Sequence, residues 1–191
     1  MRPRTLLLAS GLAMALVACL SKPDRVAGVD AGRADAAGGV CDANRCGSKS
    51  GTCVGAVCVI RQGTDGRVEC PDGELCRVEC VGSDACKTGG VDCKKALGCE
   101  VICLGSNACQ HGVDCADAPT CKVRCEGTSA CQGDGESSVQ CRHGSCDVTC
   151  EGSTATCQQG IQLDNGATCS SHCCDGACGS NTCPTNDATC P

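Results

Sequence analysis

Cysteine is the residue that most constrains how this chain can fold, since it supplies 27 of the 191 residues. The chain has no Phe, Tyr or Trp, the side chains that usually dominate the burial energetics of a core. The remaining apolar side chains are mainly Val, Ala and Leu, so covalent cross-links have to compensate. The composition therefore predicts a disulfide scaffold that forms in an oxidising compartment.

The cysteines recur in a repeat whose units start at Cys76, Cys99, Cys121 and Cys146, and a degenerate fifth unit begins at Cys169. The starts are 23, 22, 25 and 23 residues apart, a period typical of solenoid coils. Each unit opens with Cys-x-Val-x-Cys, in which the intervening positions are mostly charged or polar. This alternation predicts a short strand with one buried face. The strand is followed by a Gly-Ser or Gly-Thr turn, then by Ala-Cys or Ala-Thr-Cys, and finally by a second alternating strand with the pattern Val-x-Cys.

The fourth unit carries Leu163 where the earlier units have the cysteine of Val-x-Cys, so this position is predicted to point inward. A unit that buries its inner face only by stacking on identical neighbours follows the logic of a solenoid. We therefore predict an all-β, disulfide-rich fold, a small parallel β-solenoid of about four to five coils with cysteine-rich ends. A string of tandem small disulfide knots is the alternative.

Chain geometry restricts which cysteines of a unit can pair. The first and second lie four residues apart, roughly 13 Å on a strand, which exceeds the Cα separation of roughly 7 Å that a bridge tolerates. Pairing the third with the fourth would leave Cys157 without a partner. Pairing the second cysteine with the third, and the fourth cysteine with the first of the next unit, leaves no cysteine of the repeat without a partner. It predicts these bridges: Cys80–Cys86, Cys103–Cys109, Cys125–Cys131, Cys150–Cys157, Cys70–Cys76, Cys93–Cys99, Cys115–Cys121 and Cys141–Cys146.

Bridges between adjacent coils remain the alternative, because strands about 4.8 Å apart also satisfy the distance limit. On either pairing, residues 70–168 form the predicted four-unit repeat domain. Residues 41–69 and 169–191 are predicted to form cysteine-rich caps. The spacing Cys-x4-Cys-x6-Cys occurs in both caps, from Cys41 and from Cys178, and either marks modules that cover the ends of the stack or is a coincidence of cysteine density.

The N-terminus carries the pattern of an export signal. A positively charged start, Met1 to Arg4, precedes an apolar stretch over residues 6–17 that is too short for a membrane span of about 20 residues. The stretch ends in Leu-Val-Ala-Cys at residues 16–19, which resembles the lipobox of bacterial lipoproteins. The resemblance implies that residues 1–18 are a lipoprotein signal peptide and that Cys19 is lipid-modified. Ordinary cleavage, which would leave Cys19 a plain thiol, is the alternative.

Cysteine arithmetic agrees with a lipid on Cys19, because setting one of 27 cysteines aside leaves an even number that can all pair. Residues 19–40 are predicted to be the lipidated N-terminus and a flexible linker with a reach of roughly 25 Å. Leu20 stands where, in Gram-negative lipoproteins, Asp commonly signals retention in the inner membrane. The resemblance thus implies an exported protein anchored by lipid to the outer membrane of the cell envelope, with the membrane as its partner.

Charge and spacing argue against several binding functions. Removal of residues 1–18 takes away Arg2 and Arg4, so the formal charge of −6 becomes −8. An acidic chain without aromatic stacking platforms is not expected to bind nucleic acid. The Cys-x-Cys and Cys-x-x-Cys spacings of metallothionein-like chains do not occur, and zinc sites commonly use closely spaced cysteine pairs. No metal site and no cofactor are therefore predicted.

Catalytic motifs such as Gly-x-Ser-x-Gly and His-Glu-x-x-His are also missing from the sequence. Asp92 and Asp114 occupy equivalent places in two units, but Gln140 and Gln162 replace them in the next two, which suits a solvated face better than a catalytic pair. The histidines are interpreted as surface turn residues: His111, His143 and His172. We predict a non-enzymatic structural or adhesive lipoprotein with an unidentified protein or cell-surface partner. A thiol-rich metal-binding or redox-buffering envelope protein is the alternative.

Overall fold

The computed structural model describes residues 39–133, 135, 137–152, 156–163 and 167–173. The predicted signal peptide, Cys19, the linker up to residue 38 and the C-terminal cap from residue 174 lie outside the described residues. Everything described belongs to one of the two compact units of the chain, residues 38–191. No helix within the described ranges is long and apolar enough to cross a membrane.

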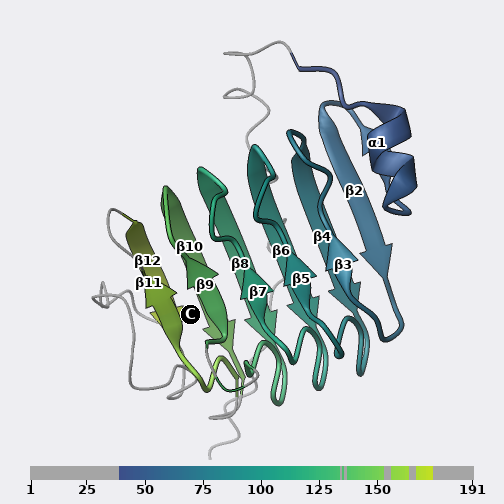
Figure 1. Ribbon diagram of the computed structural model, residues 1–191. Helices are drawn as coiled ribbons and strands as arrows, with labels where there is room; N and C mark the ends of the chain where they lie inside the picture. The colour runs from purple at the N-terminus through teal and green to yellow at the C-terminus, as the bar shows by residue number, and fades with distance from the viewer. Residues whose placement is uncertain (1–38, 134, 136, 153–155, 164–166, 174–191) are drawn as a thin grey trace, which may run out of the picture. The chain divides into compact units, whose positions relative to one another are not determined.

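The alternating segments of the repeat form strands that wind into a parallel β-solenoid (Figure 1). Long strands build a seven-stranded sheet in the order β1-β2-β4-β6-β8-β10-β12, and short strands build a five-stranded sheet in the order β11-β9-β7-β5-β3. All neighbours pair in parallel except β1 and β2. The predicted fold class is thus confirmed. The long strands are β1 (Thr52–Val54), β2 (Val57–Gln62), β4 (Leu75–Val81), β6 (Gly98–Leu104), β8 (Thr120–Glu126), β10 (Ser145–Glu151) and β12 (Thr168–Cys173).

A short strand follows each long strand from β2 to β10, so that one coil contains one strand of each sheet. These short strands coincide with the Val-x-Cys positions of the repeat and their Ile-x-Leu equivalent. Their bounds are β3 (Val68–Glu69), β5 (Val91–Asp92), β7 (Val113–Asp114), β9 (Val139–Cys141) and β11 (Ile161–Leu163).

The pairing register stacks equivalent residues of successive units directly on one another. In the long sheet, Val78 pairs with Val101, Val101 with Val123, and Val123 with Val148. These four valines have essentially no solvent exposure and belong to a continuous core that also contains the bridged cysteines. A single unit cannot bury its valine alone, whereas stacked units bury each valine against the next one. This explains why the units stack.

The turns between the two sheets form a third ladder of hydrogen bonds between coils. The backbone N–H of Cys109 donates to the carbonyl oxygen of Ala85 at 2.9 Å, and that of Cys131 donates to Ala108 at the same distance. Cys109 adopts a left-handed backbone conformation, with φ at 50°, which most residues avoid. Its side chain is tied into a disulfide, so the covalent bond helps to hold this backbone in place.

The corner that precedes each of these turns is crowded by backbone. At Gly105, φ is +126°, and a Cβ atom would lie 2.7 Å from both the carbonyl carbon and the carbonyl oxygen of Gly82 in the preceding coil. Only glycine combines this conformation with so close an approach of two chains. At Gly105 and Gly127, where the added Cβ would meet the preceding coil at 2.7 Å, glycine is therefore required by the stacking as well as by the turn.

The N-terminal end of the stack is closed by the short helix α1 (Ala43–Ser48) and by β1, which pairs with β2. Asp42 caps the helix by accepting a hydrogen bond from the backbone N–H of Asn44 at 2.8 Å. Two disulfides, Cys41–Cys53 and Cys46–Cys58, join this cap to β1 and β2. The two disulfides therefore tie the N-terminal cap covalently to the end of the stack.

The stacked strands extend beyond the limits drawn from the sequence. Strands β2 and β3 lie inside 41–69, and β12 runs from Thr168 into the range 169–191. Gln62 explains the first difference, because it stands in register with Cys80 and so removes the Cys-x-Val-x-Cys signature from the first coil.

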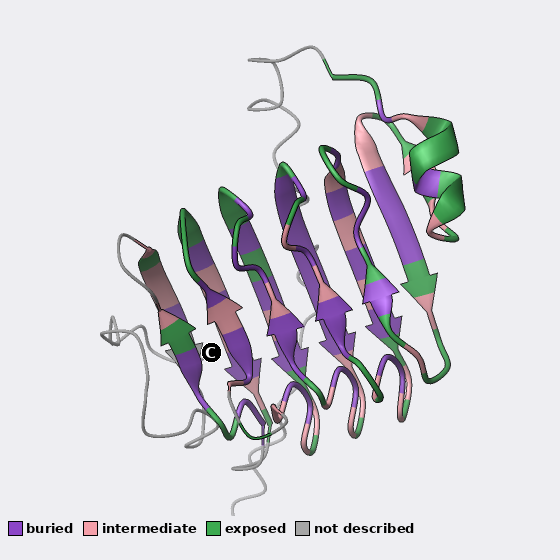
Figure 2. Ribbon diagram, viewed as in Figure 1, coloured by how far each residue is buried: buried purple, intermediate pink, exposed green. Residues whose placement is uncertain are grey.

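Burial follows the expected alternation along β4, β8 and β10, as Figure 2 shows, whereas three successive residues of β2, Cys58 to Ile60, are all buried. Strand β6 differs, because it is buried at every position from Gly98 to Cys103. The outward-facing Glu100 is 5% exposed and Ile102 is 8% exposed. In this respect the prediction of one solvated face per strand does not hold at β6.

Candidate functional site

Two sets of side chains run along the described stack, disulfides inside and charged groups outside. The structure contains ten disulfides within its described residues, and such a density indicates an oxidising compartment. Two of them belong to the N-terminal cap. The other eight are the pairs expected from the sequence: Cys70–Cys76, Cys80–Cys86, Cys93–Cys99, Cys103–Cys109, Cys115–Cys121, Cys125–Cys131, Cys141–Cys146 and Cys150–Cys157.

Four of these disulfides stack on one another in the interior. The sulfur of Cys80 lies within 4.8 Å of both sulfurs of the next coil's disulfide, Cys103 and Cys109. The same relation recurs twice further along the stack. All eight cysteines are fully buried. We call this set the sulfur column: Cys80–Cys86, Cys103–Cys109, Cys125–Cys131 and Cys150–Cys157.

A second contact between disulfides of adjacent coils lies beside the short strands. The Cys70 sulfur is 3.7 Å from the Cys93 sulfur and 3.6 Å from the Cys99 sulfur. Groups of three cysteine sulfurs this close together would suit a soft metal ion if they were thiolates. Every cysteine in these groups is bonded to another cysteine, so in this oxidised state they offer no thiolate ligand.

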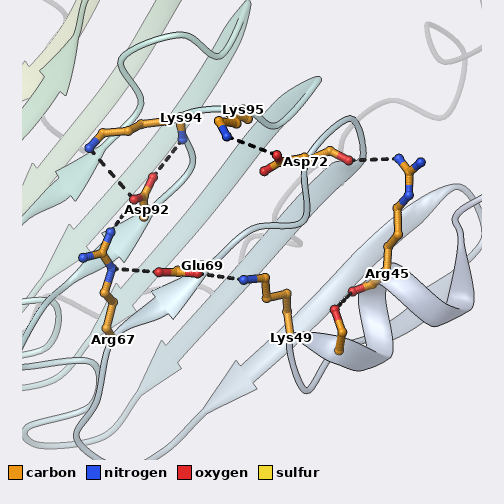
Figure 3. Close-up of polar contacts among 9 residues, drawn as sticks. Arg45, Lys49, Arg67, Glu69, Asp72, Asp92, Lys94 and Lys95 are labelled. Carbon is orange, nitrogen blue, oxygen red and sulfur yellow. Dashed lines mark hydrogen bonds and ion pairs between the residues drawn. The ribbon is translucent and has the colours of Figure 1, made fainter.

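On the outer face of the short strands, basic and acidic side chains follow one another in a continuous series of ion pairs that links neighbouring coils, part of which Figure 3 shows. Lys49 Nζ lies 2.7 Å from Glu69, whose other carboxylate oxygen lies 3.3 Å from Arg67. Arg67 also bonds Asp92 of the following coil. We call the complete set the charged ladder: Lys49, Glu69, Arg67, Asp92, Lys94 and Asp114.

These ion pairs alter the acidity of their members. The hydrogen bond from Lys49 lowers the pKa of the Glu69 carboxyl, and the same bond raises the pKa of Lys49. The hydrogen bond to Asp114 likewise raises the pKa of Lys94, whose Nζ lies 2.9 Å from that carboxylate. Each of these three pKa shifts favours the charged form of Lys49, Glu69 or Lys94.

The ladder explains the aspartates that recur in the repeat. Asp92 and Asp114 pair in register on neighbouring strands, and each also accepts a backbone N–H two residues further along at 3.1 Å. Lys94 Nζ lies between their carboxylates, 4.0 Å from Asp92 and 2.9 Å from Asp114. Both aspartates therefore stabilise the contact between neighbouring coils and the turn that follows each short strand. Gln140 and Gln162 continue the row with an amide hydrogen bond of 3.2 Å.

The histidines that the sequence singled out do not gather at one place in the described structure. His111 lies exposed on a turn. His143 is also exposed, with its Nε2 4.0 Å from the Asp117 carboxylate. The backbone of His172 belongs to β12, and its side chain lies outside the described structure.

Sequence reasoning did not find the contacts between coils in either set, because each links residues 20 or more positions apart. The charged ladder had one partial signal, namely the acidic residue of Val-Glu-Cys and Val-Asp-Cys in consecutive units. Cys19, the predicted lipidation site, lies outside the described residues. No family model, no curated protein and no solved structure matches the chain, so its function has to be inferred from the solenoid itself.

Proposed function

We propose that this protein is a lipid-anchored, non-enzymatic component of the bacterial outer membrane whose rigid repeat domain has a structural or adhesive role. The proposal rests on the observation that the side chains inside and outside the stack bond to other parts of the same stack. Disulfides close the turns that follow β4, β6, β8 and β10, and outer charges bind charges of the next coil. Bonds of this kind between parts of the stack make the domain rigid.

The rigidity has a thermodynamic basis in the short disulfide loops. Bridges such as Cys103–Cys109 close a loop with a sequence separation of 6. On the chain-entropy model each such loop contributes about 2 kcal/mol by restricting the unfolded chain. Several of them together match the stability of an ordinary domain, about 5–15 kcal/mol. A stack stabilised in this way withstands proteases in an exposed location as long as its bridges stay oxidised.

Two sequence features support the location. The Leu-Val-Ala-Cys segment ending at Cys19 resembles a lipobox, and the linker after it would hold the domain clear of the lipid surface. Membrane attachment is tested by fractionating cells that express the full chain or its Cys19→Ser variant. We expect the unchanged chain in the outer membrane with acyl chains on Cys19 by mass spectrometry. An unmodified Cys19 in a protein free of membrane would overturn the anchor.

The structural role is tested by limited proteolysis of the purified full chain with and without a dithiol reductant. We expect the region 41–173 to resist digestion when oxidised and to be cleaved throughout after reduction. A thiol count distinguishes the alternative role as a thiol-rich metal-binding or redox-buffering protein. Protein from its native membrane with few free thiols supports the scaffold, whereas many free thiols with bound metal would overturn it.

A further inference from the structure

We propose that the sulfur column is a thiol–disulfide relay, in which a thiol formed at one coil moves along the stack by intramolecular exchange. This property goes beyond a structural role, because it makes the disulfides of different coils one connected redox system. The proposal rests on contacts between disulfides of adjacent coils, which the pairing of the cysteines does not by itself imply.

The contacts have a direction along the column. Cys80 lies within 4.8 Å of both sulfurs of the Cys103–Cys109 bridge. Cys103 lies within the same distance of both Cys125 and Cys131, and Cys125 of both Cys150 and Cys157. In each step the second cysteine of one unit therefore reaches the complete disulfide of the next unit. Strand pairing keeps this arrangement, since Cys80, Cys103, Cys125 and Cys150 are in register.

The exchange step balances without any oxidant. A Cys80 thiolate attacks the sulfur of Cys109, the Cys80–Cys109 bond forms, the Cys103–Cys109 bond breaks, and Cys103 leaves with the electron pair as a thiolate. Two repetitions move the thiolate onwards, and it finally rests on Cys150. The bridges present at that stage join adjacent coils: Cys80–Cys109, Cys103–Cys131 and Cys125–Cys157.

The first thiol has a defined source. A dithiol reductant that reduces Cys80–Cys86 supplies two electrons and becomes a disulfide itself, leaving thiols on both cysteines. Complete burial in an apolar interior raises the pKa of a thiol, so little thiolate is present at neutral pH. Exchange along the column is therefore slow near pH 7. Its rate increases about tenfold per pH unit as long as the pH stays below that pKa.

The test uses the full chain with Cys86→Ser, which leaves Cys80 as the single thiol of the column without added reductant. After incubation at pH 7 to 9, acid quenching traps the thiols, and labelling in denaturant followed by peptide mapping locates them. We expect label on Cys103, Cys125 and Cys150 as well as Cys80, together with a Cys80–Cys109 peptide. The rate should not depend on protein concentration. Label that stays on Cys80 alone after prolonged incubation at pH 9 would overturn the relay.

A matched control removes the second link of the column. Adding Cys103→Ala and Cys109→Ala to the Cys86→Ser chain should confine the label to Cys80, because no disulfide remains within reach. If Cys86→Ser prevents folding, the unchanged protein is treated with substoichiometric dithiol instead. Bridges between coils, such as Cys80–Cys109, then support the relay, and thiols that appear only as the two halves of one broken bridge exclude it.

Discussion

Asp65 accepts two hydrogen bonds from Thr88, one from its backbone N–H at 2.6 Å and one from its hydroxyl at 2.8 Å. The two residues are 23 positions apart, which is one coil of the solenoid. Asp65 thus connects the loop after β2 to the turn after β4. These bonds are made by the ionised carboxyl, and the N–H of Thr88 is the main reason why the pKa of Asp65 is below its ordinary value of 3.8.

The pH dependence of this contact follows from the direction of the shift. A carboxyl whose pKa is lowered by folding adds stability above its unfolded pKa, and this contribution is lost as pH falls through the folded pKa. We expect the amide resonance of Thr88 to titrate with a midpoint below 3.8, measured by NMR. The Asp65→Asn variant is the control, and its Thr88 amide should show no such titration. A midpoint at or above the ordinary value would contradict the assignment.

Within the charged ladder, Asp92 should matter more than the exposed pairs near it. It bonds Arg67 and a backbone N–H, and its side chain is 19% exposed. We expect Asp92→Asn to lower the free energy of unfolding by about 1 kcal/mol, because charge-assisted bonds between coils are weakened. The measurement is denaturation of the oxidised protein in urea, which, unlike guanidinium chloride, does not screen the ion pairs.

Lys95 provides the matched control for Asp92. It pairs with Asp72 at 3.3 Å, and their side chains are 71% and 69% exposed. Lys95→Gln should change stability by less than about 0.5 kcal/mol, since solvent screens such a pair. Equal effects of the two substitutions would mean that the ladder contributes no more than ordinary surface pairs.

The crowded corner at Gly105 gives a prediction about backbone. Gly105→Ala should destabilise the stack by about 3 kcal/mol, because the new Cβ meets the carbonyl group of Gly82 in a conformation that alanine avoids. Gly55 serves as the uncrowded comparison, since its φ is +62° and nothing lies within 4 Å of an added Cβ. Gly55→Ala should cost only about 1 kcal/mol. Guanidinium unfolding of both variants checks the difference, and equal losses would argue against steric contact between coils.

The valine column allows a similar comparison between inside and outside. Val101 is completely buried, and Val101→Ala should lower stability by about 2 kcal/mol through lost burial and the cavity left behind. Val81 is 52% exposed at the end of β4, so Val81→Ala should cost less than about 1 kcal/mol. The unfolding midpoints of the two variants provide the test. A larger loss at Val81 would place the core on the wrong face of the sheet.

The period of the repeat and the alternation in Cys-x-Val-x-Cys were sufficient to predict strands, solenoid and inner face, because stacking of equal units leaves few other folds. The long strand of the first coil was not predicted, since Gln62 replaces the cysteine that marks the motif elsewhere, whereas Val-Glu-Cys at residues 68–70 matches the second strand of the later units. The left-handed conformation of Cys109 carries no sequence signal, because cysteine has no preference for it and the stack imposes it. Burial of Glu100 could not be predicted either, since the neighbouring strands also carry charged residues at this position, whereas Ile102 is apolar where they have Glu79 and Arg124 and so gave a signal of burial.

The contacts between coils at the candidate site were less predictable than the fold. Pairing by elimination led to the bridges of the sulfur column, but the proximity of Cys80 to the next bridge depends on strand register. The charged ladder depends on register in the same way, as the Arg67 to Asp92 bond between coils shows. Register is a property of the assembled stack, and the sequence of one unit does not contain it.

In-register pairing of equal strands also makes the length of this domain adjustable. Cys109 and Cys131 each bond the turn of the coil before them, so every unit both receives and provides the same docking surface. Duplication or loss of one unit of 22 to 25 residues would preserve these hydrogen bonds between the turns of neighbouring coils. Each unit adds about 4.8 Å along the axis. The length of the domain can therefore change in small, equal increments while the packing of its interior stays the same.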